Sequence, residues 1–65
     1  MISPLQDTAT AFDARILIVE DERLLAEELR ERLASIGATV VGAVVSGEQA
    51  IAAAEALRPD LVLMD

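Results

Sequence analysis

The sequence has no cysteine, no histidine and no lysine, and Phe12 is its only aromatic residue. Without cysteine or histidine there is no disulfide, no zinc cluster, no thiol nucleophile and no imidazole base. Any chemistry must therefore use carboxylates, hydroxyls or the backbone. The sequence also lacks a secretory signal pattern and any apolar run near the roughly 18 residues that a membrane span needs, so we expect a cytoplasmic protein without membrane contact.

Positive charge is scarce as well, since twelve acidic residues face five arginines and the formal net charge is −7. This balance argues against a surface that follows nucleic-acid phosphates, and we expect no direct nucleic-acid binding by this segment. The 65 residues are instead 54% hydrophobic, which indicates one small globular domain with an aliphatic core. Residues 1–14 predict a flexible N-terminal leader, which leaves residues 15–65 for the domain.

The first half of the domain predicts a strand followed by a helix. The continuous apolar run Ile16–Val19 is typical of a strand covered on both faces, as in parallel sheets. A helix is predicted over residues 21–36, with acidic residues in its first turn and Gly37 as a left-handed cap. Its predicted apolar stripe consists of Leu25, Leu29, Leu33 and Ile36.

The second half repeats this alternation. Residues 38–43 predict a second strand, and Ser46 with Gln49 matches a capping box that opens a second helix ending before Pro59. Leu61–Met64 is the third predicted strand, with Met64 in the core. The β-α-β-α-β order predicts an α/β fold with an open parallel sheet and right-handed crossovers. The predicted stripe of the second helix consists of Ala50, Ile51, Ala54 and Leu57.

Carboxylates follow two of the predicted strands. Glu20 and Asp21 come directly after the first strand, and Asp65 follows the third. Ligands of open α/β sheets bind beyond the carboxyl ends of the strands, where the strand order reverses, and in a 2-1-3 order the first and third strands are neighbours. Carboxylates about 5 Å apart repel by about 3 kcal/mol per pair at an effective dielectric of about 20, so a cation or a shared proton must relieve them.

An all-oxygen site favours Mg²⁺. We therefore expect Glu20 and Asp21 to bind the metal, and Asp65 to bind it and to act as the nucleophile that forms an aspartyl-phosphate. Asp21 alone would be read as a loop or cap residue, but its pairing with Asp65 favours a site. Glu22 is read as a solvated residue of the first helical turn, and Ser46 as a cap, because no base could activate it.

The stretches "ILIVEDE", "VVGAVVSGEQAI" and "RPDLVLMD" resemble the first half of the receiver domain of two-component response regulators, over residues 15–65. The resemblance implies a flavodoxin-like (CheY-like) fold lacking the last strands. It also implies a signalling phosphoacceptor, not an enzyme, which takes a phosphoryl group on Asp65 from a histidine kinase or a phosphotransfer protein with Mg²⁺. Glu20 and Asp21 match the acidic pair of the family.

The family completes its site with a Ser or Thr and a Lys from later strands, and this chain contains no lysine. We therefore do not expect the isolated 65-residue chain to be phosphorylated. An open edge at the third strand predicts self-association, completion by a partner or partial disorder. Two other hypotheses are an interaction or dimerisation module with a vestigial acidic site, and a fragment of another Mg²⁺-dependent phosphoryl-transfer enzyme.

Overall fold

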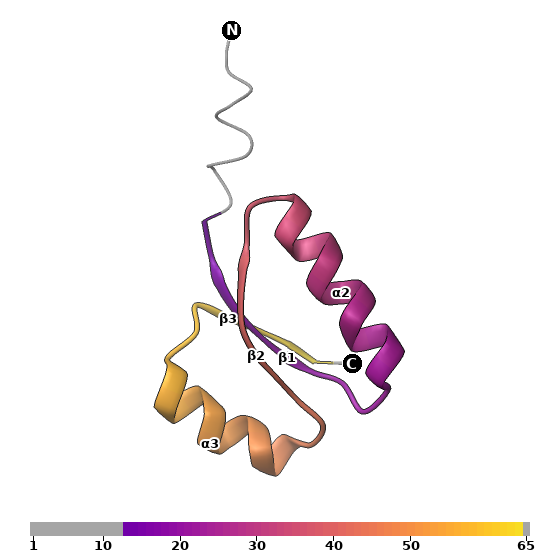
Figure 1. Cartoon of the computed structure of the whole chain (residues 1–65). Helices are drawn as coiled ribbons and strands as arrows, with labels where there is room; N and C mark the ends of the chain where they lie inside the picture. The colour runs from indigo at the N-terminus through magenta and orange to yellow at the C-terminus, as the bar shows by residue number, and fades with distance from the viewer. Residues whose placement is uncertain (1–12, 65) are drawn as a thin grey trace, which may run out of the picture.

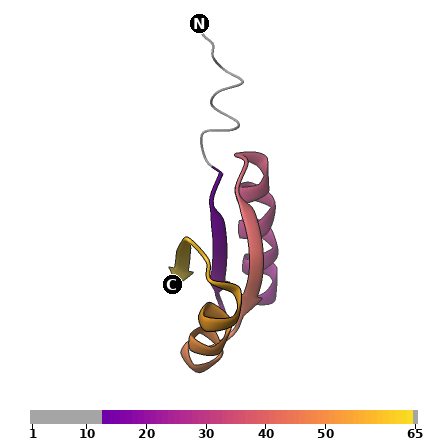
Figure 2. The ribbon, with the colours of Figure 1, turned by 90° about the vertical axis from the view of Figure 1, so that its left-hand side faces the viewer.

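The computed structural model describes residues 13–64, which form a three-stranded parallel sheet with a helix on each face (Figure 1). The strands lie in the order β2-β1-β3, so β1 is central. The turned view of Figure 2 again places the two helices on different sides of the strands. The predicted α/β class, element order and strand order are confirmed. The elements are β1 (Arg15–Val19), α2 (Arg23–Ser35), β2 (Thr39–Val44), α3 (Gly47–Leu57) and β3 (Leu61–Met64).

The core follows from the alternation of side chains along β1, since successive residues of a strand point to opposite faces. Ile16 and Ile18 pack on the face covered by α2, against Leu29 and Leu33 among others. On the other face, Leu17 packs with residues of α3. Ile16, Leu17 and Ile18 have no exposed surface at all. The unbroken apolar run of β1 is therefore explained by helices on both of its faces.

Helix α2 begins later than the predicted residue 21. Glu22 is its N-cap, and no acidic residue lies in the first turn, so the predictions of an acidic first turn and of Glu22 within it are wrong. The reason is that the Glu20 N–H still donates to the Val44 carbonyl, at 2.9 Å, which keeps the chain extended beyond β1. The helix ends at Ser35 with Ile36 as its C-cap, and Gly37 after it adopts the predicted left-handed conformation, with a φ of 97°.

Two predicted apolar stripes are confirmed only in part. Leu29 and Leu33 contact the core, whereas Ile36 is the C-cap of α2 and is 49% exposed. In α3 the packed residues follow the spacing i, i+3, i+4 and i+7, namely Ala50, Ala53, Ala54 and Leu57. Ile51 is 66% exposed, because one residue beyond Ala50 the helix has turned by about 100° away from the sheet.

Strand β3 differs most from its predicted burial. Met64 is 60% exposed, so its predicted place in the core is wrong. Leu61 and Val62 are also exposed, because β3 pairs with β1 along one edge and the described residues pair nothing with its other edge. Only Leu63 packs against a buried cluster. The third strand is thus an edge strand with apolar residues on both faces.

Strand β2 contains one irregularity. Ile16 pairs with Val40, but Leu17 pairs with Gly42, so Val41 is an extra residue in β2. A Cβ on Gly42 would lie 3.0 Å from Leu57 Cδ1, which explains a glycine at this close approach of strand and helix. Within residues 13–64, neither α2 nor α3 has the length and apolar content of a membrane-spanning helix. Of the predicted leader, residues 1–12 lie outside the described residues, and Ala14 packs against the cluster that contains Ile16.

Candidate functional site

Glu20 and Asp21 stand at the carboxyl end of the central strand, where they differ sharply in environment. Glu20 is buried, with 8% of its surface exposed, whereas Asp21 is exposed. One Glu20 carboxylate oxygen accepts a hydrogen bond from the Glu22 N–H at 3.0 Å. The N–H groups on either side of Asp21 are both hydrogen-bonded, that of Glu20 to the Val44 carbonyl and that of Glu22 to the Glu20 carboxylate. Together these bonds fix the position of the Glu20 carboxylate, while Asp21 remains open to solvent.

Both acids line an open hollow of about 330 Å³ at this edge of the sheet. The hollow spans the carboxyl ends of β1 and β3 and the start of α3. Its remaining lining residues are Val19, Val45, Ser46, Gly47 and Met64. A hollow of this size holds several water molecules, each of which takes about 30 Å³ in the liquid. It is therefore large enough for a hydrated cation and a phosphoryl group.

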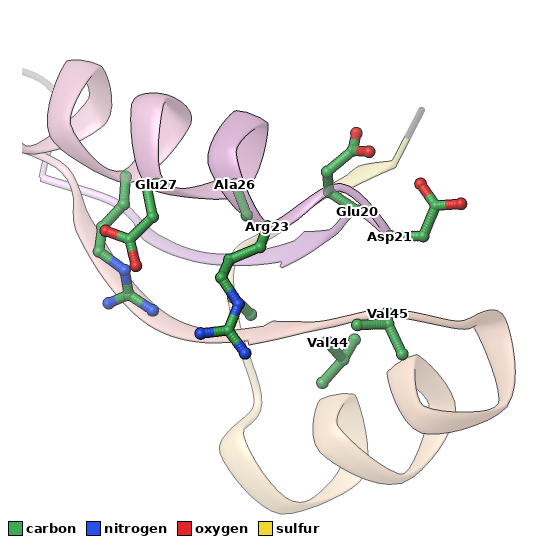
Figure 3. A pocket seen from close by; sticks show the side chains of 9 residues that line it. Glu20, Asp21, Arg23, Ala26, Glu27, Val44 and Val45 are labelled. Atoms are coloured by element: carbon green, nitrogen blue, oxygen red, sulfur yellow. The ribbon is translucent and has the colours of Figure 1, made fainter.

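A second hollow of about 360 Å³ lies beside the acidic pair, between α2 and β2 (Figure 3). Figure 3 shows the carboxylates of Glu20 and Asp21 directed away from the guanidinium of Arg23. In this view the Arg23 guanidinium does not approach either carboxylate. Because two neighbouring carboxylates at a partly buried position repel each other, the pair favours a cation from solution.

Asp65, the third predicted site residue, lies outside the described residues. It follows Met64 in the sequence, and Met64 is the register partner of Val19, the residue before Glu20. Residues 13–64 contain no group of three or more acidic, histidine or cysteine side chains that could hold a metal ion. The predicted three-carboxylate Mg²⁺ site includes Asp65, so it stays a prediction. The two acids that are described offer only oxygen donors, the type that Mg²⁺ prefers.

The neighbouring polar residues act through the backbone. Ser46 Oγ accepts from the Gln49 N–H at 3.2 Å, so Ser46 caps α3 as predicted. The Gln49 side chain accepts a hydrogen bond from the Val45 N–H, at 3.0 Å, one residue before the cap.

Sequence reasoning missed the role of the Glu22 main chain, whose N–H donates to the Glu20 carboxylate. The one sequence feature that could have indicated it is the run of three acids after β1, which is too polar to continue a buried strand.

The model of the response regulator receiver domain matches residues 16–65. This chain belongs to the response regulator receiver family. Receiver domains are modules of two-component signalling, and the acidic pair lies at the carboxyl edge of this receiver's sheet. No solved structure matches the chain.

Several curated relatives of this receiver are regulators. Transcriptional regulatory protein PdtaR from Mycobacterium tuberculosis is 42% identical over 65 residues, which cover 100% of this chain and 32% of the relative. Response regulator GacA from Pseudomonas viridiflava is 44% identical over 52 residues, or 78% of this chain and 24% of GacA. Protein CcdB from Bacillus subtilis is 39% identical over 51 residues, which cover 78% of this chain and 42% of CcdB. The chain thus spans less than half of the length of each of these relatives.

Proposed function

We propose that this receiver accepts a phosphoryl group on Asp65 from a histidine kinase or a phosphotransfer protein, with Mg²⁺ bound by Glu20, Asp21 and Asp65. The observation that carries the proposal is the parallel pairing of β1 with β3, in which Val19 is opposite Met64. The acids that follow these two residues in the sequence are Glu20 and Asp65. The proposed location is the cytoplasm, where such donors meet a receiver.

The proposed chemistry divides between the ion and the chain. Bound Mg²⁺ would neutralise charge on the oxygens of the transferred phosphoryl group. In our proposal an Asp65 carboxylate oxygen attacks phosphorus, the bond from phosphorus to the donor breaks, and the donor leaves. The Glu22 N–H holds the Glu20 carboxylate in place, at 3.0 Å. Because Glu20 is buried, its charge gains from a cation more than an exposed acid would.

The test is Mg²⁺-dependent labelling with acetyl phosphate, read by intact mass, of the full-length protein, by which we mean these residues together with the later receiver strands that complete the family's site. We expect one phosphoryl group per chain, which is lost in Asp65→Asn and on removal of Mg²⁺ with EDTA. Glu22→Gln is the matched control, because it removes one exposed acid beside the site and leaves the main-chain N–H that Glu20 accepts from. Labelling that persists in Asp65→Asn would overturn the proposal.

A second candidate is an interaction or dimerisation module with a vestigial acidic site. It is favoured by the exposed apolar residues of β3, namely Leu61, Val62 and Met64. Under this alternative, association or partner binding is the same with or without Mg²⁺ and in Asp65→Asn. Under the phosphoacceptor proposal, Mg²⁺ and the phosphoryl group both change association or partner binding. Measuring this binding with and without Mg²⁺, and in Asp65→Asn, therefore separates the two functions.

A further inference from the structure

A polar cluster lies at the opposite end of the sheet from the acidic pair, where β1 and β3 begin. The Arg15 N–H donates to Asp60 Oδ2 at 2.8 Å, and the Asp60 N–H donates to the Arg15 carbonyl at 2.7 Å. The Arg15 side chain also donates, through Nη1, to the Arg58 carbonyl at 2.7 Å. Two residues that are 45 positions apart in the sequence thus exchange main-chain and side-chain hydrogen bonds.

The pairing of β3 with β1 needs such a device, because the side chains of the two strands do not define it. Register is normally set by alternation, since a slip of one residue moves every apolar side chain to the wrong face. Here β1 contributes Ile16–Val19 and β3 contributes Leu61–Met64, and all eight residues are apolar. A slip by one residue would still place apolar side chains on both faces. Apolar alternation therefore does not select the register, whereas the polar residues at the strand starts can.

The segment before β3 is itself fixed. Arg58 adopts a left-handed conformation, with φ 52° and ψ 61°, as the C-cap of α3. Pro59 follows, and its ring restricts its own φ to about −65°. The Arg58 carbonyl that results from this turn is the acceptor for the Arg15 guanidinium. The Arg15 side chain thus binds the loop before β3, and the Asp60 carboxylate binds the main chain at the start of β1.

We propose that Arg15, Arg58 and Asp60 form a register clamp, in which Asp60 is the positioning residue that aligns β3 with β1. A strand advances by about 3.3 Å per residue, and consecutive side chains point to opposite faces. A slip of one residue would therefore move Met64 by about 3.3 Å from its place opposite Val19 and turn its side chain to the other face. The proposed site takes Asp65 from the next position of the sequence, so it depends on this register. This inference rests on the proposed function, in which Glu20 and Asp65 bind one Mg²⁺.

The test compares Asp60→Ala, which removes the carboxylate, with Asp60→Asn, which keeps an oxygen acceptor, in the full-length protein. NMR reports the register through cross-strand contacts between Val19 and Met64, and acetyl phosphate labelling reports the rate. For Asp60→Ala we expect a second set of β3 signals that accounts for most of the protein, and labelling slower by about tenfold or more. Only the chains left in the original register are labelled at the original rate, because a displacement of about 1 Å already costs about a hundredfold. Asp60→Asn should restore most of both.

Glu55→Ala is the matched control, because Glu55 is an exposed acid of α3 that lies near Arg58 and Val62 but outside the clamp. Its register and labelling rate should equal those of the unchanged protein. If Asp60→Ala does not fold, Arg15→Met carries the test, since it removes the guanidinium that donates to the Arg58 carbonyl and leaves the main-chain bonds between Arg15 and Asp60 in place. For Arg15→Met we expect a smaller loss in the same direction.

A single, unshifted β3 register together with a labelling rate within twofold of the unchanged protein, in Asp60→Ala or in its substitute Arg15→Met, would overturn the clamp. The NMR arm does not depend on phosphorylation. Failure of the phosphoacceptor function, seen as labelling that persists in Asp65→Asn, therefore leaves the register test intact. A purely structural role of Asp60 predicts a lower unfolding temperature with one register and an unchanged rate in the folded protein, which also counts against the proposal.

Discussion

Glu20 is the buried acid among the described residues, and another acid follows it directly in the sequence. Its exposed fraction is 8%, and Asp21 follows it directly. Among residues 13–64, the Glu20 carboxylate accepts a hydrogen bond from the Glu22 N–H. Burial of a carboxylate costs free energy unless hydrogen bonds or a cation compensate it, so we expect a cation to stabilise Glu20.

Glu20→Gln is therefore expected to raise the unfolding temperature in the absence of Mg²⁺, since it removes the repulsion from Asp21 and the cost of a buried charge. In Mg²⁺ the order should reverse, because an ion at about 100 times its Kd stabilises the unchanged protein by about 2.7 kcal/mol, and the variant loses a ligand. Thermal unfolding followed by circular dichroism, with and without Mg²⁺, measures both effects.

Glu22→Gln is the control for this prediction, because it removes the same charge from an exposed position nearby. Its unfolding temperature should change little in either condition. Stabilisation by Mg²⁺ that is undiminished in Glu20→Gln would contradict the assignment of Glu20 as a metal ligand.

Local hydrogen bonds define the end of α2 and the start of α3, and the contribution of each to the free energy of unfolding can be measured separately. In α2, the Ala38 N–H donates to the Leu33 carbonyl at 3.0 Å and the Gly37 N–H to the Ala34 carbonyl at 3.1 Å, which is a Schellman motif. In α3, Ser46 supplies the opening cap. The sequence identified the key residue of both, because caps depend on residues a few positions apart.

Ser46→Ala is expected to lower the free energy of unfolding by about 1 kcal/mol, since the Gln49 N–H then loses its acceptor in the protein. Urea unfolding followed by circular dichroism measures the loss. Ser35→Ala is the control, because Ser35 Oγ only donates to the Arg32 carbonyl in the last turn of α2 and caps no N–H. A loss in Ser35→Ala as large as in Ser46→Ala would show that the cap contributes nothing of its own.

Contact between β2 and α3 gives a second prediction about the elements. At Gly42, a Cβ would meet Leu57 Cδ1 at 3.0 Å and Leu17 Cδ1 at 3.3 Å, so Gly42→Val should cost about 1–3 kcal/mol through overpacking. Combination with Leu57→Ala should make the cost of Gly42→Val smaller, as expected for residues in contact. Urea unfolding of the single and double variants measures this coupling.

Gly47→Ala is the matched control, because a Cβ at Gly47 has no atom within 4 Å. This change in the first turn of α3 should be neutral or stabilising, since alanine favours a helix over glycine. Equal stability of Gly42→Val and the unchanged chain would contradict the close packing of β2 against α3.

The surface of the whole chain combines two opposing properties. The net charge of −7 repels a second copy, whereas exposed Leu61, Val62 and Met64 on β3 favour association. Charge repulsion is screened by salt, while the burial of apolar surface is not. We therefore predict that the 65-residue chain associates in a concentration-dependent way and that added salt strengthens the association.

Size-exclusion chromatography with light scattering tests this prediction at low and high salt. Val62→Glu should shift the chain towards the monomer, because it places a charge on the apolar surface of β3. Ile51→Glu is the control, since Ile51 is 66% exposed on α3 and lies outside that strand. A cooperative, well-folded monomer at all concentrations would contradict association through β3.

The sequence alone determined the order of the elements and the site to look for. The unbroken apolar run of β1 predicted a strand covered on both faces, and Gly37 and Ser46 predicted the helix ends. These features are local, because they depend on neighbouring residues and on strong conformational preferences. The parallel crossovers also followed, since parallel strands in one sheet require long connections.

Only the tertiary structure decided which side chains are buried. Glu20 and Glu22 are both acids of the same connection, yet Glu20 is buried and Glu22 is exposed. Ile51 and Met64 are apolar, yet both are exposed. Burial depends on what packs against a residue from distant parts of the chain, and periodicity indicates that only in part. The same reason hid the pairing of Arg15 with Asp60, because nothing local shows that the start of one strand meets the start of another.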